Sequence, residues 1–561
     1  IKLEVEGFRS IREQIDLKFS VDSPTVLVGE NNAGKSNIIR AVDLILGEWW
    51  PGNHEPQDHE YWDRKPDNGL ITIRAYFREM FGRDYQGDFE VDHFLWKANS
   101  RNENKVLFKA VDKNGRERAV NNPLRDQCTC FSIIADRRLS YQLSYTSKFT
   151  LLAKLMRKFH GKLVEDVNRV SNLKIKFDEI RAIFDEVAQF GDFRRELKNQ
   201  FGEMFAGMSY GLQVDFSAYD PSNFFHSLRM QAVENETIRT FEELGTGQEQ
   251  LLALAFAHAY AKAFFGGIFL AIEEPEAHLH PLAQEWLAKK IKEMSSDGLQ
   301  VMMTTHSPSF VDLLDLEGCA LVKKTDRATI VIQLSKIALA QHCIRRGSNL
   351  SRTKAETILP FYSASATHEI KAGLFARKVM LVEGQTESFA LPLYLAKVGL
   401  DVTKEGIAII PVMGKGNLAK WLRFFGAFET PTFVTFDNDN SDDLEGRKRK
   451  DVLLALGIEE DKINTAIETH TWTLGIYHCI FGQDFEETMR ESFEKYREKE
   501  TEARELLGES KPLIARYVAE QLEKNEADVG WQKFSELSAT LKSLAIAEIE
   551  SDQQVADNLP F

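Results

Sequence analysis

The chain has 561 residues, and 43% of them are hydrophobic, enough to fill the cores of about three or four domains. Its 70 Lys and Arg residues against 85 Asp and Glu residues give a net charge of −15, so any binding of nucleic acid requires a local basic patch. The five cysteines form no CxxC pair, which argues against a disulfide framework and a zinc ribbon. Because the first residues also lack a signal segment, we expect a protein of the reducing cytoplasm.

The first 46 residues predict the opening of a nucleotide-binding α/β domain. They comprise an amphipathic strand, a turn at Pro24, an apolar strand over 25–28, a glycine-rich loop and a helix over 35–46. Short alternating segments between 70 and 134 indicate an antiparallel sheet at the edge of the same domain. From 151 to 208 apolar residues recur at helical spacing among charged ones, which predicts an inserted helical hairpin.

The α/β pattern returns in the second half of the chain. The apolar stretch 251–272 carries His258 and Lys262 and is broken by two glycines, so we interpret it as helix, turn and strand, not as a membrane span. A strand at 300–304 follows. Four further apolar strands come next, and each except the third leads into a plausible helix. These strands occupy 378–382, 406–410, 432–436 and 476–481, and a charged helical remainder starts at about 485.

The segment from Gly29 to Ser36 matches the pattern GxxxxGK[ST] between a predicted strand and a predicted helix. Glycines let backbone N–H groups approach phosphate oxygens, Lys35 supplies positive charge, and the Ser36 hydroxyl can reach Mg²⁺. The pattern therefore predicts a site for the phosphates of ATP. Its candidate ligands are Gly29, Asn32, Gly34, Lys35, Ser36 and Asn37.

Three further segments belong to the predicted ATP site. A buried strand runs into Glu273 and Glu274, which we assign to the Mg²⁺ shell and to polarising the attacking water, respectively. A turn with Gly245 and Gly247 opens a long apolar helix, an arrangement that favours anions and looks like a degenerate cassette signature. His306 follows the next strand, at the place of a switch histidine.

A histidine pair follows the two acids. His278 and His280 lie two residues apart, a spacing that does not bring both side chains to one helix face. We therefore interpret their segment as a loop that couples two ATP sites, not as a zinc site.

Carboxylates also end three strands of the C-terminal series, in the order ExxxE, DxD and DxE. Acids four apart at a helix start, or two apart in extended chain, can share one side. Several carboxylates at one sheet edge raise one another's pKa unless cations neutralise them, so the pattern predicts hard divalent metals. The turn at 412–417 ends another strand and could contact a phosphate. The acids are Glu383 and Glu387, Asp437 and Asp439, and Asp484 and Glu486.

The order of the glycine-rich loop, the signature turn, the acid pair and His306 resembles cassette-type ATPases related to chromosome-maintenance and recombination proteins. The later order of acids resembles the toprim fold of topoisomerases, primases and nucleases. Together the two parts resemble the OLD family of bacterial and phage endonucleases, named from an overcoming-lysogenisation defect. The resemblance implies an α/β fold: an ABC/SMC-like P-loop ATPase domain with a helical insertion, then a toprim domain with C-terminal helices.

The resemblance also implies an activity. It is metal-dependent cleavage of DNA by two Mg²⁺ or Mn²⁺ ions held on the carboxylates, regulated by ATP and used in anti-phage defence. The family's basic residue downstream of the acids has Lys511 as its candidate here. The implied partners are DNA, further copies of the chain in a dimer or larger homo-oligomer, and a defence partner, either a retron DNA–RNA element or a second protein. No membrane partner is expected.

Two alternatives remain open from the residues. One is an ATP-gated DNA clamp or sensor with an idle toprim domain, and the other is a topoisomerase, which requires a tyrosine nucleophile on a DNA-gate domain. The basic patches that could contact the backbone phosphates of DNA are Arg137-Arg138, Arg345-Arg346 and the run 447–450.

We expect five segments along the chain. They are the first ATPase part at 1–140, a helical insertion for dimerisation at 141–209, the second ATPase part at 210–375, the toprim domain at 376–500 and its helical end at 501–561.

Overall fold

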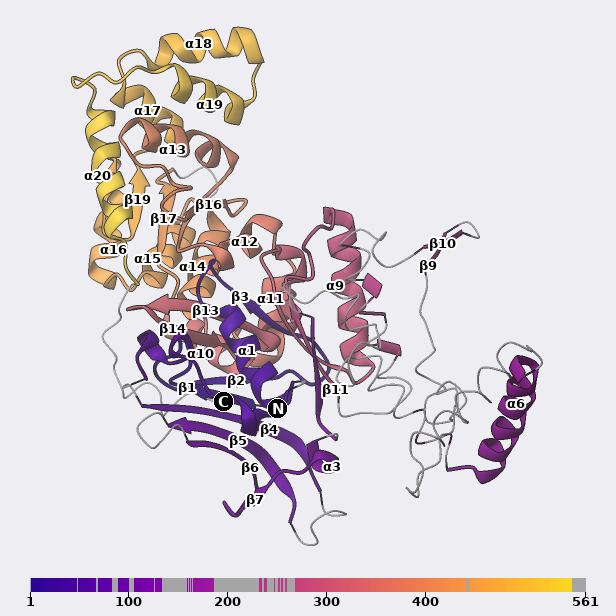
Figure 1. Cartoon of the computed structure of the whole chain (residues 1–561). Coiled ribbons are helices and arrows are strands. Elements are labelled where there is room, and N and C mark those ends of the chain that lie inside the picture. Colours follow the sequence, from indigo (N-terminus) through magenta and orange to yellow (C-terminus); the bar gives the residue numbers. More distant parts are fainter. Residues whose placement is uncertain are drawn as a thin grey trace, which may run out of the picture. The chain divides into compact units, whose positions relative to one another are not determined.

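The computed structural model describes residues 2–47, 49–66, 69–82, 89–99, 105–125, 127–133, 165–185, 268–439 and 443–546, with short stretches and single residues between 159 and 259 (Figure 1). The chain divides into two compact units. The first comprises Ile1–Ile45, Pro51–Asp126 and Ile272–Phe561, and the second comprises Leu46–Trp50 and Gln127–Ala271.

Six antiparallel strands near the N-terminus form one sheet. They are β1 (Lys2–Glu6), β2 (Ile15–Lys18), β4 (Leu70–Phe81), β5 (Val91–Asn99), β6 (Lys105–Val111) and β7 (Glu117–Ala119). In space their order is β2-β1-β4-β5-β6-β7. Ile15 and Leu17 of β2 are buried while Asp16 and Lys18 are exposed, because alternate side chains share a face of the strand. The predicted antiparallel sheet is confirmed for the segments from 70 to 119, whereas the last predicted segment forms a strand, Thr129–Ile133, that is not part of this sheet.

A second sheet of the first unit carries the glycine-rich loop. Its strands include β3 (Thr25–Val28), β12 (Gln300–Thr304), β13 (Cys319–Thr325) and β14 (Ala328–Gln333). β3 pairs in parallel with β12 and β13, and β14 is antiparallel to β13. All four residues of β3 are buried, as expected for a central parallel strand covered on both faces. Helix α1 (Lys35–Leu46) starts at the end of the loop, so the predicted strand, loop and helix are confirmed.

The C-terminal part of the first unit is built on a third sheet. Its strands are β15 (Lys378–Val382), β16 (Ile407–Pro411), β17 (Thr432–Asp437), β18 (Thr473–Leu474) and β19 (His478–Phe481). Their order is β16-β15-β17-β19-β18, and the first four are parallel while β18 is antiparallel. The three strands that lead into acids, β15, β17 and β19, are therefore direct neighbours whose carboxyl ends lie at one edge.

Helices connect and follow these strands (Figure 1). They are α13 (Gln385–Lys397), α14 (Leu418–Ala427), α15 (Arg447–Ala455), α16 (Glu460–Glu468), α17 (Phe485–Ser492), α18 (Tyr496–Leu507), α19 (Lys511–Gln521) and α20 (Val529–Ser543). The sequence predicted no helix after the third strand, and this was wrong. Helix α15 escaped prediction because it starts with four basic residues, which hide its apolar periodicity.

Aromatic packing holds the C-terminal helices together. The rings of Tyr394 in α13 and Phe534 in α20 stack with centroids 4.5 Å apart, and Phe493 stacks on the same tyrosine at 5.5 Å. All three side chains are buried, so the helical end belongs to the core of the C-terminal sheet. The predicted helical remainder is confirmed.

Three helices link the second and third sheets along the chain: α10 (Lys336–Arg345), α11 (Ala355–Ser363) and α12 (His368–Ala372). In the second unit the described elements are β8 (Thr129–Ile133), α6 (Val167–Asp185), β9 (Ala232–Glu234) and β10 (Thr237–Arg239). Helix α6 lies inside the predicted helical insertion, and most of that insertion lies outside the described residues. None of the described helices is both long and apolar enough to cross a membrane.

Candidate active sites

Two glycines shape the phosphate-binding loop. Gly29 has a φ of +135°, and a Cβ there would lie 2.1 Å from the carbonyl oxygen of Val322 in β13. Gly34 has a φ of +109°, and its Cβ would lie 2.1 Å from Oγ1 of Thr329 in β14. Only glycine fits both positions, so the loop packs tightly against these two strands.

Lys35 is buried at the start of α1, and its Nζ donates to the carbonyl oxygens of Gly29 and Glu30, each at 2.8 Å. Burial lowers the pKa of Lys35 to about 8, although the nearby carboxylates of Glu274, Glu276 and Glu30 oppose that shift. The ammonium thus lies at the loop, where a phosphate would meet it.

Other loop residues differ in exposure. Ser36 and Asn32 are exposed, and Asn32 has a φ of +64°. Asn37 donates from Nδ2 to Oγ of Ser10 at 2.6 Å, so its side chain braces the helix start against the N-terminal strands. Ser36 is therefore the accessible hydroxyl for a metal ion beside the phosphates.

The second half of the predicted ATP site lies close to Lys35. The backbone N–H of Glu274 donates to the carbonyl oxygen of Thr304 at 3.0 Å, which joins the acid to the end of β12. His306 Nε2 lies 3.4 Å from Glu274 Oε1, and its backbone N–H donates to Glu276 Oε1 at 2.5 Å. Burial, followed by the charge of Lys35, lowers the pKa of His306. Sequence analysis did not assign Glu276 to this site, and only its position just after the acid pair could have indicated it.

The structure describes only some of the other residues that were predicted for the ATP site. Glu273 is buried as the last residue of β11 (Ile268–Glu273). Gly245 lies outside the described residues, and Gly247 belongs to the second unit. His280 Nδ1 accepts the backbone N–H of Ala283 at 3.3 Å and caps α9 (Pro281–Ser296), so this histidine stabilises a helix start.

The acidic strand ends of the third sheet are joined by hydrogen bonds. Glu383 follows β15, and its Oε1 accepts the backbone N–H of Asp437 at the end of β17, at 2.7 Å. Glu387, one turn into α13, accepts the backbone N–H of Gly384 at 3.1 Å through Oε2. Gly384 has an extended backbone with a φ of −146°, so the predicted need for glycine at this turn is not confirmed, although both glutamates flank it at the end of β15.

These carboxylates influence one another's protonation. Burial raises the pKa of Glu383 to about 7, with further increases from Glu387 and Asp439 and a decrease from Lys415. Burial also raises the pKa of Asp437 well above its usual range, and Glu383, Glu387 and Glu486 add to that shift. The pKa of Glu387 is raised for the same reasons. Carboxylates from all three strand ends therefore share one electrostatic environment.

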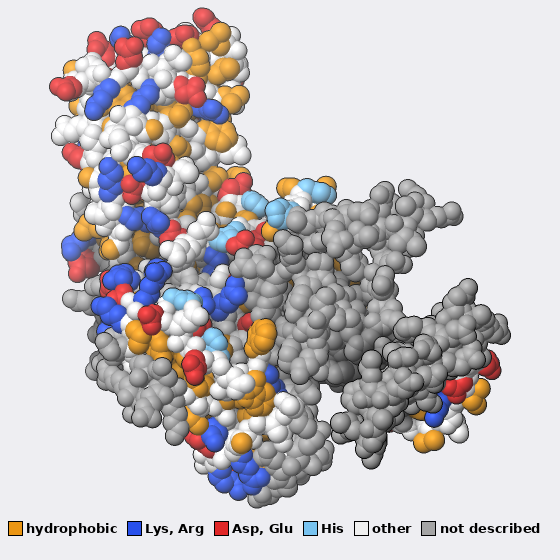
Figure 2. Space-filling model, in the orientation of Figure 1, with side chains coloured by type: hydrophobic (Ala, Val, Ile, Leu, Met, Phe, Trp, Pro, Cys, Tyr) orange, Lys and Arg blue, Asp and Glu red, His pale blue; other side chains and the backbone are white. Residues whose placement is uncertain are grey.

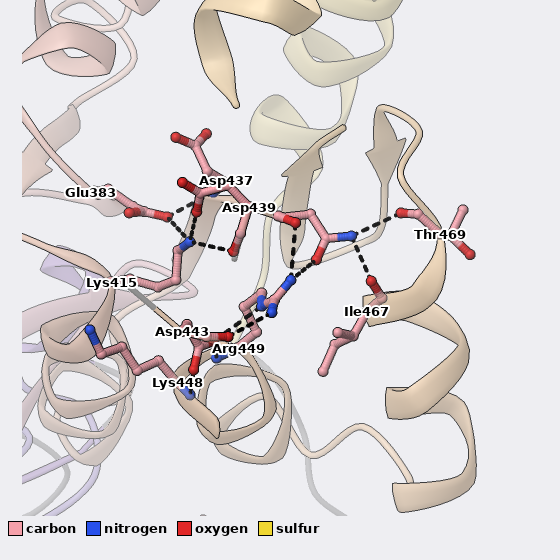
Figure 3. Close-up of polar contacts among 10 residues, drawn as sticks. Glu383, Lys415, Asp437, Asp439, Asp443, Lys448, Arg449, Ile467 and Thr469 are labelled. Atoms are coloured by element: carbon pink, nitrogen blue, oxygen red, sulfur yellow. Dashed lines mark hydrogen bonds and ion pairs between the residues drawn. The ribbon is translucent and has the colours of Figure 1, made fainter. Parts of the chain in front are cut away.

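Lys415 lies among these acids (Figure 3). Its side chain is 1% exposed, and its Nζ lies 2.5 Å from Asp439 Oδ1 and 3.8 Å from Glu383 Oε1. The lysine comes from the short turn Lys415–Asn417 after β16, the turn that the sequence marked as a contact for phosphate. An internal cation thus balances part of the negative charge.

Asp484 and Glu486 differ in their contacts. Asp484 Oδ1 accepts the backbone N–H of Glu487 at 2.6 Å and so caps α17. Glu486 is mostly buried, and Nζ of Lys511 lies 3.6 Å from its Oε1. The Lys511 side chain is 74% exposed at the start of α19. The basic residue that was predicted downstream of the acids therefore lies beside the acidic cluster and is accessible.

The chemistry of the acidic cluster fits divalent metal ions. Asp437 Oδ1 is buried and has no hydrogen-bond partner among the described residues. Buried carboxylates that raise one another's pKa are destabilised when ionised, and a divalent cation removes that penalty. An all-oxygen set of side chains suits Mg²⁺ or Mn²⁺. Within the described ranges, no group of three or more His, Cys, Asp or Glu side chains is arranged so that it could hold a metal ion.

Two of the proposed basic DNA contacts are buried. Arg449 pairs with Asp443 at 3.1 Å and donates to Asn438 Oδ1 at 2.7 Å (Figure 3). Arg346 is also buried, and its NH1 lies 3.5 Å from the carbonyl oxygen of Ala455. The prediction that these two arginines hold phosphates was wrong, because packing turns them inward. Arg137 and Arg138 lie outside the described residues.

Two family models match the chain. A model described as an AAA domain, putative AbiEii toxin, Type IV TA system, matches residues 25–312, just over half of the chain. A model described as the overcoming lysogenization defect protein-like TOPRIM domain matches residues 374–439. The second match begins just before β15 and ends at Asp439.

Curated relatives match most of the length of the chain. An OLD nuclease of Thermus scotoductus is 27% identical over 78% of this chain and 81% of its own length. The Old nuclease of Escherichia phage P2 is 20% identical over 79% of this chain and 78% of its length. Endonuclease GajA of Bacillus cereus is 19% identical over 73% of this chain and 70% of its length. With an AAA-type ATPase domain followed by a TOPRIM domain, the chain belongs to the OLD family of nucleases.

Proposed function

We propose that this OLD-family nuclease cuts DNA by hydrolysis of phosphodiester bonds with two divalent metal ions, Mg²⁺ or Mn²⁺. The observation that carries the proposal is the meeting of carboxylates from three neighbouring parallel strands, with one buried oxygen of Asp437 left without a partner among the described residues. The names of the relatives, two OLD nucleases and an endonuclease, support it.

The metal ligands in this proposal are Glu383, Glu387, Asp437, Asp439, Asp484 and Glu486. When bound, the ions would supply a water of lowered pKa and stabilise the leaving oxygen. The protein's own cations have separate tasks. Lys511 is exposed beside Glu486 and can contact the phosphate that is cut, while Lys415 holds Asp439 and Glu383 in place.

ATP has a regulatory role in this proposal. Gly29, Lys35 and Ser36 bind the phosphates, Glu273 joins the Mg²⁺ shell, and Glu274 with His306 faces the terminal phosphate. The signature turn of a second copy completes the site, so the active form is a dimer or larger homo-oligomer. Because metal-assisted hydrolysis of DNA consumes no ATP, the nucleotide controls access or assembly.

The biological setting that we propose is anti-phage defence in the bacterial cytoplasm. A retron DNA–RNA element or a second protein would act as a regulatory partner. Expression of the chain should lower the plating efficiency of a sensitive phage by about tenfold or more, and Glu383→Ala should abolish the effect. Equal protection by both forms would contradict a role for DNA cleavage.

The test of the activity is nicking of supercoiled plasmid with Mg²⁺ or Mn²⁺, with and without ATP. We expect the unchanged chain to convert plasmid to nicked or linear forms, and Glu383→Ala to lose at least about 100-fold in rate. Lys35→Ala should keep metal-dependent cutting but lose its response to ATP. An exposed-site control, Glu526→Gln, should behave as the unchanged chain.

A further inference from the structure

A cavity of about 570 Å³ lies between the linker helices and α14, and it is lined in part by the turn that carries Lys415. Its wall includes the loop after α10, the first turns of α11, the backbone of Gly416 and the side chains of Lys420 and Arg423. The sequence analysis named Arg345 and Arg346, at the end of α10 and just after it, as candidate phosphate contacts, and the proposed nuclease chemistry does not use them.

The cavity carries excess positive charge. Of its charged wall residues, Arg423 is paired with Asp451 at 2.5 Å. Arg352, Lys354 and Lys420 also line it, and none of these three forms an ion pair with a described carboxylate. Burial lowers the pKa of Lys420 to about 8, and its Nζ donates to two neutral oxygens, the carbonyl oxygen of Phe361 and Oγ of Ser365, each at 2.5 Å. An anionic ligand therefore suits the cavity. On the face shown in Figure 2, Lys and Arg side chains are interspersed with acids over the C-terminal part, so local positive charge coexists with the negative net charge.

An aromatic ring stands next to these cations. Phe361 lines the cavity and is 54% exposed. Lys420 Nζ lies 3.9 Å from the centre of its ring, and the buried Tyr362 packs edge-on at 5.4 Å. The ring is therefore held in place with part of its surface open. Exposed aromatic rings beside basic side chains are the common platform for unpaired bases.

The cavity and the acidic cluster share one short turn. Gly416 contributes its backbone to the cavity wall, while the preceding Lys415 places its ammonium against Asp439 and Glu383. A Cβ on Gly416 would lie 3.7 Å from Lys448 Cδ, so a further basic side chain flanks the turn. The turn therefore joins the wall of the cavity to the acidic cluster.

We propose that this cavity binds one unpaired nucleotide of the DNA strand, next to the phosphate that is cut. This inference rests on the proposed function. Arg352, Lys354 and Lys420 hold the phosphate of this nucleotide, and Phe361 stacks on its base. Because a base inside a duplex cannot reach the ring, the favoured substrate has a single-stranded or flipped-out nucleotide at this position.

The test is binding of a short fluorescent oligonucleotide to the full chain, measured by anisotropy in the presence of chelator so that no strand is cut. We expect Phe361→Ala to weaken binding of the single strand by about tenfold, and Arg352→Ala/Lys354→Ala by about tenfold or more, with a smaller loss for duplex DNA. The matched control Lys404→Ala/Lys524→Ala removes two exposed lysines elsewhere on the C-terminal part and should bind as the unchanged chain. Phe361 is exposed, so its variant should fold, and a thermal melt checks this.

Equal affinities of the variants and the unchanged chain would overturn the proposal. Competition with free dAMP distinguishes a free nucleotide from a nucleotide within a DNA strand. If Phe361→Ala weakens the binding of dAMP but leaves oligonucleotide binding unchanged, the cavity binds free nucleotides, and its assignment to the DNA strand is wrong. In plasmid cleavage, Arg352→Ala/Lys354→Ala should raise KM and leave kcat nearly unchanged. Glu383→Ala should lose cleavage but retain oligonucleotide binding, so a failure of the nuclease function and a failure of the cavity assignment give different results.

Discussion

At the scale of single residues, Lys415 is a buried cation within the acidic cluster. Its buried ammonium contacts Asp439 and Glu383, and both carboxylates sit at strand ends that would otherwise repel each other. A lysine in this position supplies part of the positive charge that divalent ions supply when they bind. Metal binding and this lysine are therefore linked.

Lys415→Met should lower the stability of the chain in chelator, on the order of 3 kcal/mol, because buried acids lose their charge partner. Mn²⁺ should then raise the melting temperature of this variant more than that of the unchanged chain, since the ion replaces the missing charge. Thermal melts across a Mn²⁺ titration measure both effects, with exposed Lys450→Met as control. Equal Mn²⁺-induced shifts in all three proteins would show that Lys415 does not balance the cluster.

The raised pKa of Glu383 makes stability depend on pH. The pKa is about 7 in the folded chain against an ordinary value of 4.5, so the folded state holds this proton more tightly than the unfolded state. The resulting stabilisation is complete below pH 4.5 and is lost as the pH rises through 7. Above that range, Glu383→Gln should be more stable than the unchanged chain in chelator, by on the order of 3 kcal/mol. Melts at both ends of the range check this; a difference that persists below pH 4.5 would contradict it.

At the scale of elements, the loop from β17 to α15 depends on one buried arginine. Arg449 joins the side chains of Asp443 and Asn438, and Asn438 donates in turn to the carbonyl oxygens of Ile467 and Thr469 at 2.8 and 3.0 Å (Figure 3). Asn438 stands between the two aspartates of the acidic cluster. The arginine therefore fixes the backbone that presents Asp437 and Asp439.

Arg449→Ala should destabilise the chain by about 3–5 kcal/mol, because it leaves a buried aspartate without its partner. Plasmid cleavage should fall with it, as the acidic loop loses its support. Arg447→Ala is a matched control two residues away, since that side chain is 82% exposed, and it should change stability by less than about 0.5 kcal/mol. Urea or thermal unfolding monitored by circular dichroism distinguishes the two, and similar losses in both variants would refute the assignment.

At the scale of the whole molecule, the first unit connects the phosphate-binding loop to the nuclease strands. Lys323 in β13 donates to the carbonyl oxygens of Phe428 and Glu429, each at 2.7 Å, in the loop that leads to β17. The residue before it, Val322, is the one that packs on Gly29. Arg377, just before β15, forms an ion pair with Glu30 of the phosphate-binding loop. Two of the three strands that end in acids, β15 and β17, thus begin at contacts with the ATPase sheet or its loop.

Lys323→Ala should therefore weaken the effect of ATP on plasmid cleavage, by about 0.5–2 kcal/mol in coupling free energy. The half-buried Lys323, whose pKa is lowered to about 8 by burial, loses three hydrogen bonds to the C-terminal part when truncated. Lys324→Ala is the matched control, because the neighbouring side chain is exposed. Cleavage rates with and without ATP give the coupling directly, and an unchanged ratio in Lys323→Ala would exclude this route.

Elements with a strong local pattern were predictable from sequence. The strands at 25–28, 300–304 and 378–382 were predicted to the residue, because short runs of buried apolar residues end at glycine, threonine or glutamate. The acids at their ends followed from the same pattern. Helix α15 was missed since its first turn is entirely basic, and Glu276 was missed because no local pattern separates it from a solvated loop.

By itself, the sequence determined the order of the chemical groups: a glycine-rich phosphate loop, an acid pair and three acidic strand ends in an ATPase and TOPRIM arrangement. Only the tertiary structure decided which charges share one environment. It turned Arg346 and Arg449 inward, placed Lys415 among the acids, and opened a basic cavity lined in part by the turn that carries this lysine. The physical reason is that burial and pairing of charges depend on strand order and packing between distant segments, which local residue patterns do not encode.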